Sequence, residues 1–189
     1  MKRRLMVFAA LLLMALTAAC GKTQPPEPPA PPVQEEIEPP PEPTAEELAA
    51  QEVQEILDSL TMEEKVGQLF FVRCPGENAL EDIGTYHLGG YVLFGRDFAD
   101  KTADDVIQTL RRYQNAATED SGIPLLIGVD EEGGTVVRVS SNPHLRASKF
   151  PSPQKAYASG GMEAVLADTR EKDLLLSALG FNVNLSPVA

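Results

Sequence analysis

Basic and aromatic residues are scarce in this chain of 189 residues. Sixteen lysines and arginines stand against 28 aspartates and glutamates, so the formal net charge at pH 7 is −12. Aromatic residues make up 6% of the chain, and tryptophan is absent. Nucleic acid or an anionic membrane surface would need a basic face, and stacking of bases would need aromatic platforms. The composition therefore argues against nucleic acid as a partner.

Cysteine is also rare, since the chain has only Cys20 and Cys74. Cys20 ends an amino-terminal export-like segment, whereas Cys74 follows an apolar run, so the sequence does not support a disulfide framework. We expect Cys74 to be a small buried residue rather than a reactive thiol, because free cysteines are usually buried.

The amino terminus has the pattern of an export signal. Basic residues at positions 2–4 precede an apolar run over residues 5–16, which is too short to span a bilayer comfortably. The following segment, LTAACG, resembles the lipobox of bacterial lipoproteins, in which the cysteine is lipidated. We therefore predict a lipoprotein-type signal peptide over residues 1–20, lipidation of Cys20, and an exported protein anchored to the membrane of the cell envelope. Ordinary secretion with cleavage is the alternative.

Residues 21–43 are rich in proline and glutamate. Ten of the 16 prolines lie in this segment, and almost no apolar residues accompany them. Such a composition cannot bury enough surface to offset the entropy of ordering, so we predict a disordered linker with extended polyproline character. The foldable part is then residues 44–189, which is long enough for one modest core.

The foldable part alternates helical and strand patterns. Thr44 and Thr61, each followed three residues later by glutamate, predict two helix starts. Further helices are predicted from Thr102 to the turn at Gly122 and over residues 162–179, with a loop over 140–159. Each predicted strand is an apolar run that borders a glycine or a predicted helix. The predicted strands cover residues 69–72, 89–95, 123–129 and 181–188.

This alternation predicts an α/β protein with a parallel sheet and right-handed crossovers. Four strands fit either a small doubly wound sheet or the first half of a (β/α)8 barrel. The chain ends directly after the last predicted strand, and an open half-barrel would expose a strand edge. We therefore expect that the barrel is interrupted at Ala189.

A cluster of polar residues follows the third predicted strand. Asp130, Glu131 and Glu132 come directly after it and precede two glycines. Carboxyl ends of buried parallel strands are where α/β proteins place binding sites. Asp130 could also cap a helix or lie in a surface turn, and the two glutamates could be solvated or paired with Arg138. We expect no metal and no cofactor here, and the carboxylates would repel a phosphate.

Five motifs in one order identify a family resemblance. They are KVGQLFFV, GGYVLFGR, PLLIGVDEEGGTVVR, FPSPQ and ALGFNVNLSPVA. The chain from about Leu57 to Ala189 resembles the family 3 glycoside hydrolases, most closely the bacterial β-N-acetylhexosaminidase branch. The resemblance implies that residues 44–189 are the incomplete amino-terminal half, with about four strands, of a (β/α)8 barrel domain.

The resemblance also implies a substrate site. Asp130 matches the family's aspartate that binds sugar hydroxyls in the −1 subsite, and Arg138 matches an arginine of the same site. A carboxylate accepts hydrogen bonds from two hydroxyls, and a guanidinium donates in a fixed fork. Thr135 replaces an arginine common in related sequences. The implied substrate is terminal β-N-acetylglucosamine in cell-wall glycans. A non-catalytic sugar-binding or scaffold lipoprotein and a β-glucosidase of the same family are the alternatives.

The family's catalytic groups have no counterpart in these 189 residues. Family catalysis is retaining, with an aspartate nucleophile and, in this branch, a histidine near a Lys-His-Phe-Pro-Gly motif that the chain does not contain. His87 and His144 are expected in surface or loop positions. Asn182 and Asn184 are expected to face the same side and fix the barrel interior. We therefore expect no catalytic residue in residues 1–189 and no hydrolysis by them alone.

Overall fold

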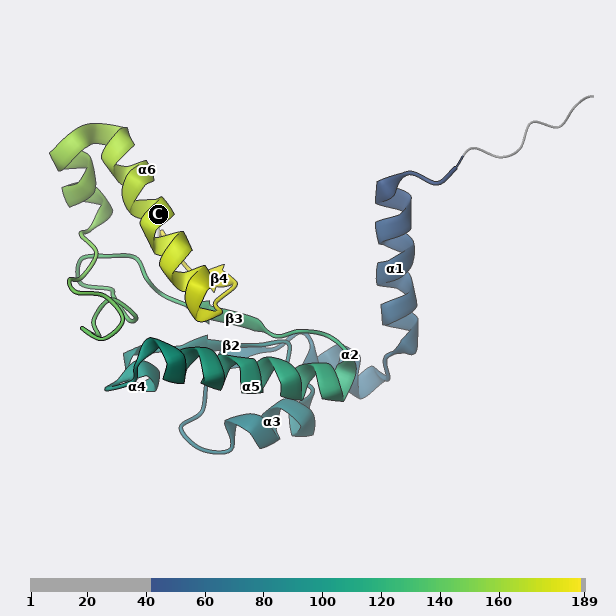
Figure 1. The fold of residues 1–189 in the computed structure, drawn as a ribbon. Helices are drawn as coiled ribbons and strands as arrows, with labels where there is room; N and C mark the ends of the chain where they lie inside the picture. The colour runs from purple at the N-terminus through teal and green to yellow at the C-terminus, as the bar shows by residue number, and fades with distance from the viewer. Residues whose placement is uncertain (1–41, 188–189) are drawn as a thin grey trace, which may run out of the picture. The chain divides into compact units, whose positions relative to one another are not determined.

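The computed structural model describes residues 42–187, most of which belong to a compact unit that begins at Pro43. Four parallel strands form one sheet in the order β1-β2-β3-β4 (Figure 1). The strands are β1 (Phe71–Arg73), β2 (Gly90–Leu93), β3 (Leu126–Val129) and β4 (Val183–Asn184). The predicted parallel α/β sheet is confirmed, although each strand is shorter than predicted.

Helices alternate with these strands. They are α1 (Ala45–Ser59), α2 (Met62–Gly67), α3 (Ala79–Tyr86), α4 (Gly95–Phe98), α5 (Ala103–Ser121) and α6 (Pro153–Leu179). The predicted helix starts at Thr44, Thr61 and Thr102 are confirmed, because each threonine caps its helix and the acidic residue three positions later completes a capping box. Gly122 and Gly180 end α5 and α6 in the left-handed conformation.

Two features of the helices differ from the prediction. Helix α3 was not predicted, although Asn78 and Glu81 have the spacing of a capping box. In the structure Asn78 has a φ of 61° and makes no side-chain capping bond. Helix α6 begins at Pro153, inside the predicted loop over residues 140–159, with Ser152 as its cap. Gly160 and Gly161 have non-helical dihedral angles, so α6 is two helical segments joined at a kink.

One face of the sheet forms the core. Tyr91 and Leu93 of β2 and Ile127 and Val129 of β3 are almost fully buried in one hydrophobic cluster with side chains of α3, α5 and α6. The predicted apolar stripe of α5 belongs to the same cluster, which includes its Val106, Leu110 and Ala117. Burial of these side chains removes about 1.5–3 kcal/mol of unfavourable hydration each.

The opposite face is more open. Phe71 of β1 lies across Gly90 and Gly128, where an added Cβ would come within 2.6 and 2.5 Å of its ring. The two glycines are therefore needed to make room for one aromatic ring. The third strand is not buried on both faces, because Leu126 is 50% exposed.

One smaller prediction, the burial of Cys74, is confirmed. Cys74 is a free, buried cysteine, and burial raises the pKa of its thiol, which disfavours the reactive thiolate. Arg96 pairs with its neighbour Asp97, with 3.5 Å between Nε and Oδ1.

The predicted signal peptide over residues 1–20, the lipidation of Cys20 and nearly all of the predicted linker over residues 21–43 lie outside the described residues. They stay predictions. None of the helices within residues 42–187 is long and apolar enough to cross a membrane.

Candidate substrate site

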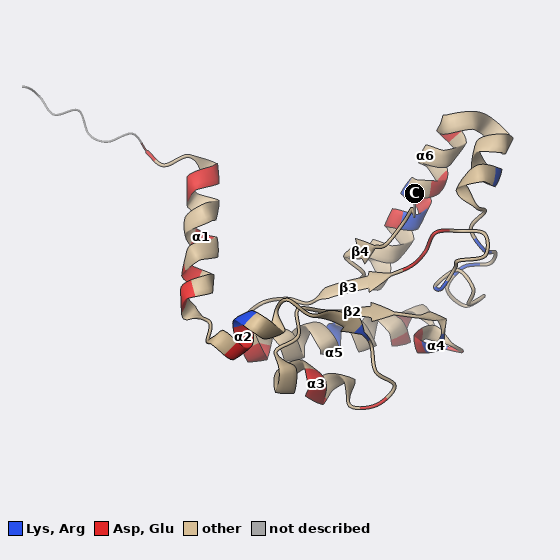
Figure 2. Ribbon diagram, turned by 180° about the vertical axis from the view of Figure 1, so that it is seen from behind, with Lys and Arg blue, Asp and Glu red and all other residues tan. Residues whose placement is uncertain are grey.

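The acidic turn, defined as residues 130–134, leaves the carboxyl end of β3 (Figure 2). Gly133 and Gly134 both have positive φ values, 98° and 70°. A Cβ at position 133 would lie 2.1 Å from the carbonyl oxygen of Pro151, so only glycine fits this backbone. The turn therefore packs closely against the segment that precedes α6.

Glu131 is fully buried, with no exposed surface. Its Oε2 accepts hydrogen bonds from the main-chain N–H groups of Arg138 (2.8 Å), Val139 (2.7 Å) and Ser140 (3.4 Å). The hydroxyl of Ser140 donates to its Oε1. These donors compensate the carboxylate for the loss of water. The expectation that Glu131 is solvated or paired with an arginine side chain is wrong.

Asp130 and Arg138, the two predicted substrate ligands, lie side by side. The Nη2 atom of Arg138 is 3.4 Å from Oδ2 of Asp130, and the two side chains are 27% and 25% exposed. The Nε atom of Arg138 is buried and has no hydrogen-bond partner among the described residues. The structure therefore places the two residues side by side, and the Nε–H group of Arg138 donates no hydrogen bond among the described residues. Their role as sugar ligands stays a prediction.

Lys172 of α6 holds the acidic turn from the other side, a contact that was not predicted from the sequence. Its side chain is 6% exposed, and its Nζ lies 2.7 Å from Oδ2 of Asp168. The same Nζ donates to the main-chain oxygen of Glu132 at 3.1 Å. A lysine four residues after an aspartate on a helix reads as an ordinary surface pair, so no local signal distinguishes this buried contact.

Two asparagines connect β4 to β3. Asn182 accepts from the N–H of Ile127 (2.6 Å) and donates to the oxygen of Leu125 (2.9 Å). Asn184 accepts from the N–H of Glu131 (3.1 Å) and donates to the oxygen of the same residue (3.5 Å). Both side chains thus bond to main-chain atoms of neighbouring residues, and Asn184 fixes the main chain of the acidic turn. Their predicted place in the barrel interior stays a prediction.

A cavity of about 400 Å³ adjoins this end of the sheet, between α6 and the end of β4. Its lining includes Asp168, Lys172, Asn184 and Ser186. Thr135, which replaces an arginine that is common in related sequences, is exposed just beyond the acidic turn. No residue of the acidic turn lines this cavity, but Lys172 and Asn184, which hydrogen-bond to the main chain of the turn, do.

The histidines do not join the acidic turn. His87 is only partly buried, and its Nδ1 lies 2.8 Å from Oδ2 of Asp120. It precedes β2, whereas Asp130 follows β3, so in a parallel sheet the two residues lie at opposite edges. His87 thus lies in a partly exposed turn and His144 in an exposed loop, so the predicted surface or loop positions are confirmed for both.

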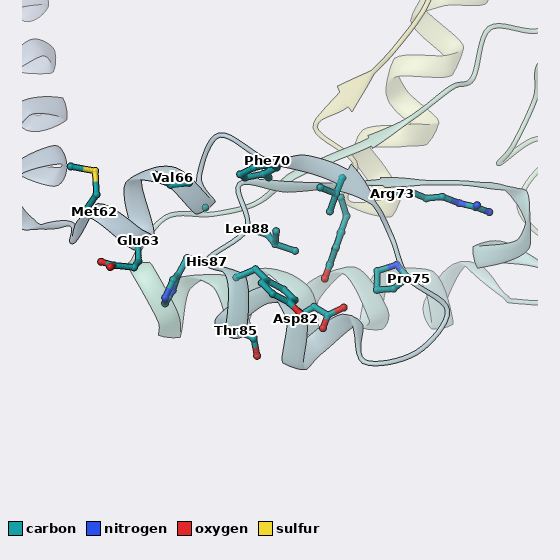
Figure 3. A pocket seen from close by; sticks show the side chains of 14 residues that line it. Met62, Glu63, Val66, Phe70, Arg73, Pro75, Asp82, Thr85, His87 and Leu88 are labelled. Carbon is teal, nitrogen blue, oxygen red and sulfur yellow. The ribbon is translucent and has the colours of Figure 1, made fainter.

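A larger cavity, of about 650 Å³, lies elsewhere. It is bordered by α2, α3 and β1, and its lining is mostly apolar, with Val66, Phe70 and Leu88 among its residues (Figure 3). No residue of the acidic turn lines it. Across residues 42–187, no cluster of histidine, cysteine, aspartate or glutamate has the arrangement to hold a metal ion. Convergent polar groups, rather than cavity size, identify the acidic turn as the candidate site.

Comparisons with known proteins identify the family of the chain. The sequence pattern of the Glycosyl hydrolase family 3 N terminal domain matches residues 61–189. The chain is 31% identical over 111 residues to Beta-hexosaminidase A of Pseudoalteromonas piscicida, a match that covers 57% of this chain and 18% of that protein.

Two solved structures share the fold. A glycoside hydrolase family 3 beta-N-acetylglucosaminidase from Paenibacillus sp. str. FPU-7 is 30% identical with a TM-score of 0.59, over 68% of this chain and 24% of that one. A GH3 family glycosyl hydrolase from Mycobacterium smegmatis str. MC2 155 is 23% identical with a TM-score of 0.54, over 69% and 37%. The predicted fold class, an α/β half-barrel with four strands, is confirmed, and the chain spans only 18% to 37% of these relatives.

Proposed function

The chain belongs to glycosyl hydrolase family 3, and from this we propose that it supplies part of a binding site for a terminal β-N-acetylglucosamine residue. The observation that carries the proposal is the contact between Asp130 and Arg138 at the carboxyl end of β3. Both groups are partly exposed and come from one loop.

The chemistry of the pair suits a sugar. The Asp130 carboxylate can accept hydrogen bonds from two neighbouring hydroxyls, and Arg138 can donate to a hydroxyl or carbonyl oxygen through its planar fork. Glu131 and Lys172 hold the main chain on either side, through bonds to the N–H of Arg138 and to the oxygen of Glu132. The two ligand side chains are therefore held in place before the sugar arrives, which lowers the entropic cost of binding.

The proposed sugar class rests on two relatives, a beta-hexosaminidase and a beta-N-acetylglucosaminidase by name. We propose that the activity served by this site is retaining hydrolysis of β-N-acetylglucosaminides in cell-wall glycans, on an exported lipoprotein anchored through Cys20. Residues 1–189 are proposed to bind the sugar without hydrolysing it, because no described histidine lies with Asp130.

An NMR titration of the full chain with the methyl β-glycoside of N-acetylglucosamine tests the proposal. Affinity for a single sugar is expected on the order of a millimolar, which amide chemical shifts detect. The shifts should concentrate in residues 130–138. Asp130→Ala should weaken binding at least about tenfold, since it removes a charged acceptor.

Thr135→Ala is the matched control, because it alters an exposed side chain of the same loop. It should leave the affinity within about twofold of the original. A parallel titration with methyl β-glucoside distinguishes a glucosidase-like site. Absence of shifts in residues 130–138, or equal affinity of the Asp130→Ala variant, would contradict the proposal.

A further inference from the structure

A second arginine lies beside the candidate site, and no step above uses it. Arg73 is the last residue of β1, Phe94 directly follows β2, and Asp130 directly follows β3. These three strands are neighbours, and their parallel register places Leu93 opposite Val129. Arg73, Phe94 and Asp130 therefore all lie at the carboxyl edge of the sheet.

Phe94 brings the two arginines together. The Cζ atom of Arg73 lies 5.0 Å from the centre of its ring, and that of Arg138 lies 5.4 Å from the same centre. Both distances are within the range of a cation–π interaction. The Arg73 side chain extends past the end of β1, away from Val66 and His87 (Figure 3).

Arg73 differs from its neighbours at this edge in its charge partners. Asp130 pairs with Arg138, but within residues 42–187 no carboxylate lies at ion-pair distance from Arg73, which is exposed. Arg138 and Arg96 each have a carboxylate partner, Asp130 and Asp97, so Arg73 differs from both. The buried Nε atom of Arg138 also lacks an acceptor among the described residues. Within this part of the chain, Arg73 and the Nε–H group of Arg138 are therefore donors without an acceptor at this edge.

We propose that Arg73, held by Phe94, forms a subsite for a carboxylate on the sugar that adjoins the one bound by Asp130 and Arg138. The inference rests on the proposed function, because that sugar must occupy the Asp130 position. A carboxylate matches the guanidinium fork in geometry and charge. Arg73 thereby makes the protein selective for acidic over neutral glycans.

Two matched pairs of disaccharides test this subsite. In each pair, N-acetylglucosamine is β-linked to an acidic sugar or to the carboxamide of that sugar, so that only the charge differs. One pair carries glucuronic acid and the other N-acetylmuramic acid, which distinguishes a ring carboxylate from a lactyl ether carboxylate. Calorimetric titration of the full chain at low salt should show about fivefold tighter binding of at least one acid than of its carboxamide.

The variants assign that preference to one side chain. Arg73→Gln should abolish the preference for the acid and leave the affinity for the carboxamide within about twofold of the original. Arg73→Lys should keep part of the preference for the acid, because lysine carries the positive charge but lacks the planar guanidinium that binds a carboxylate through two donors. Arg111→Gln is the charge-matched control, since Arg111 is an exposed arginine of α5, and it should keep the full preference.

Three results overturn the subsite. These are equal binding of acids and carboxamides by the original chain, an equal loss for both forms in Arg73→Gln, and a loss of preference in Arg111→Gln. Asp130→Ala separates this inference from the proposed function. If Asp130→Ala weakens carboxamide binding while Arg73→Gln keeps the preference for the acid, the proposed function stands and the subsite fails. If Asp130→Ala leaves carboxamide binding unchanged, the proposed function itself fails.

Discussion

Asp130 and Glu131 are neighbours in the chain, but their carboxylates lie in opposite environments. The Asp130 side chain is 25% exposed and contacts one arginine, whereas Glu131 has no exposed surface and accepts hydrogen bonds from three main-chain N–H groups and a hydroxyl. The open half of the acidic turn is free to bind a ligand. The buried half holds the following loop in position. Adjacent acids in a sequence therefore need not share a role.

Alanine at position 131 should cause the largest change in stability. Glu131→Ala leaves its main-chain and hydroxyl donors buried without their acceptor, so we expect the free energy of unfolding to fall by about 3 kcal/mol. Urea unfolding measures the change. Glu132→Ala is the matched control, because Glu132 is only partly buried, and it should cost less than about 0.5 kcal/mol. Equal losses of unfolding free energy in Glu131→Ala and Glu132→Ala would contradict the difference between the buried and the partly exposed carboxylate.

Removal of the Lys172 ammonium should have the next largest effect. Lys172→Met leaves Asp168 with little solvent and the oxygen of Glu132 without its donor. We expect a loss of about 2 kcal/mol and faster amide exchange at Gly133 and Gly134. The double variant Lys172→Met with Asp168→Leu should recover most of the stability, since replacing both partners of a buried pair is often neutral. A double variant no more stable than the single one would contradict this.

The smallest effect is expected at Asp105. Its carboxylate accepts hydrogen bonds, as that of Glu131 does, but it is exposed to water. The side chain and the main-chain N–H of Thr102 lower the pKa of Asp105 in the capping box of α5. The folded pKa lies below the unfolded value, so the stabilisation is complete above about pH 3.8 and is lost as the pH falls through the folded pKa.

Amide exchange at the start of α5 should therefore accelerate as the pH falls below that value, after correction for intrinsic rates. In Asp105→Asn this pH dependence should disappear, because asparagine does not titrate. An unchanged acid response in the variant would show that another group controls the start of this helix.

Local signals in the sequence predicted much of the fold. The capping boxes at Thr44, Thr61 and Thr102 start helices where expected, and apolar runs beside glycines form the strands. Helix α3 was missed although Asn78 and Glu81 have capping-box spacing, and the structure shows no side-chain cap there. The first segment of α6 was missed because its Pro-Ser-Pro start has the composition of a turn.

The candidate site was only partly predictable, because its support comes from residues distant in sequence. Asp130 and Arg138 were identified through motif resemblance. The burial of Glu131 was not, since its donors are seven to nine residues away. The contact of Lys172 with Glu132 crosses forty residues, and Arg73 approaches Arg138 only because the sheet aligns the ends of β1 and β3.

We propose that Asp130 binds the sugar because of where its carboxylate lies, and not merely because it is negatively charged. The most direct test compares the affinity for methyl β-N-acetylglucosaminide of Asp130→Asn and Glu132→Gln, two variants that each neutralise one partly exposed carboxylate of the acidic turn. We predict at least about tenfold weaker binding for Asp130→Asn and a change within about twofold for Glu132→Gln. Equal affinities in the two variants would contradict the account.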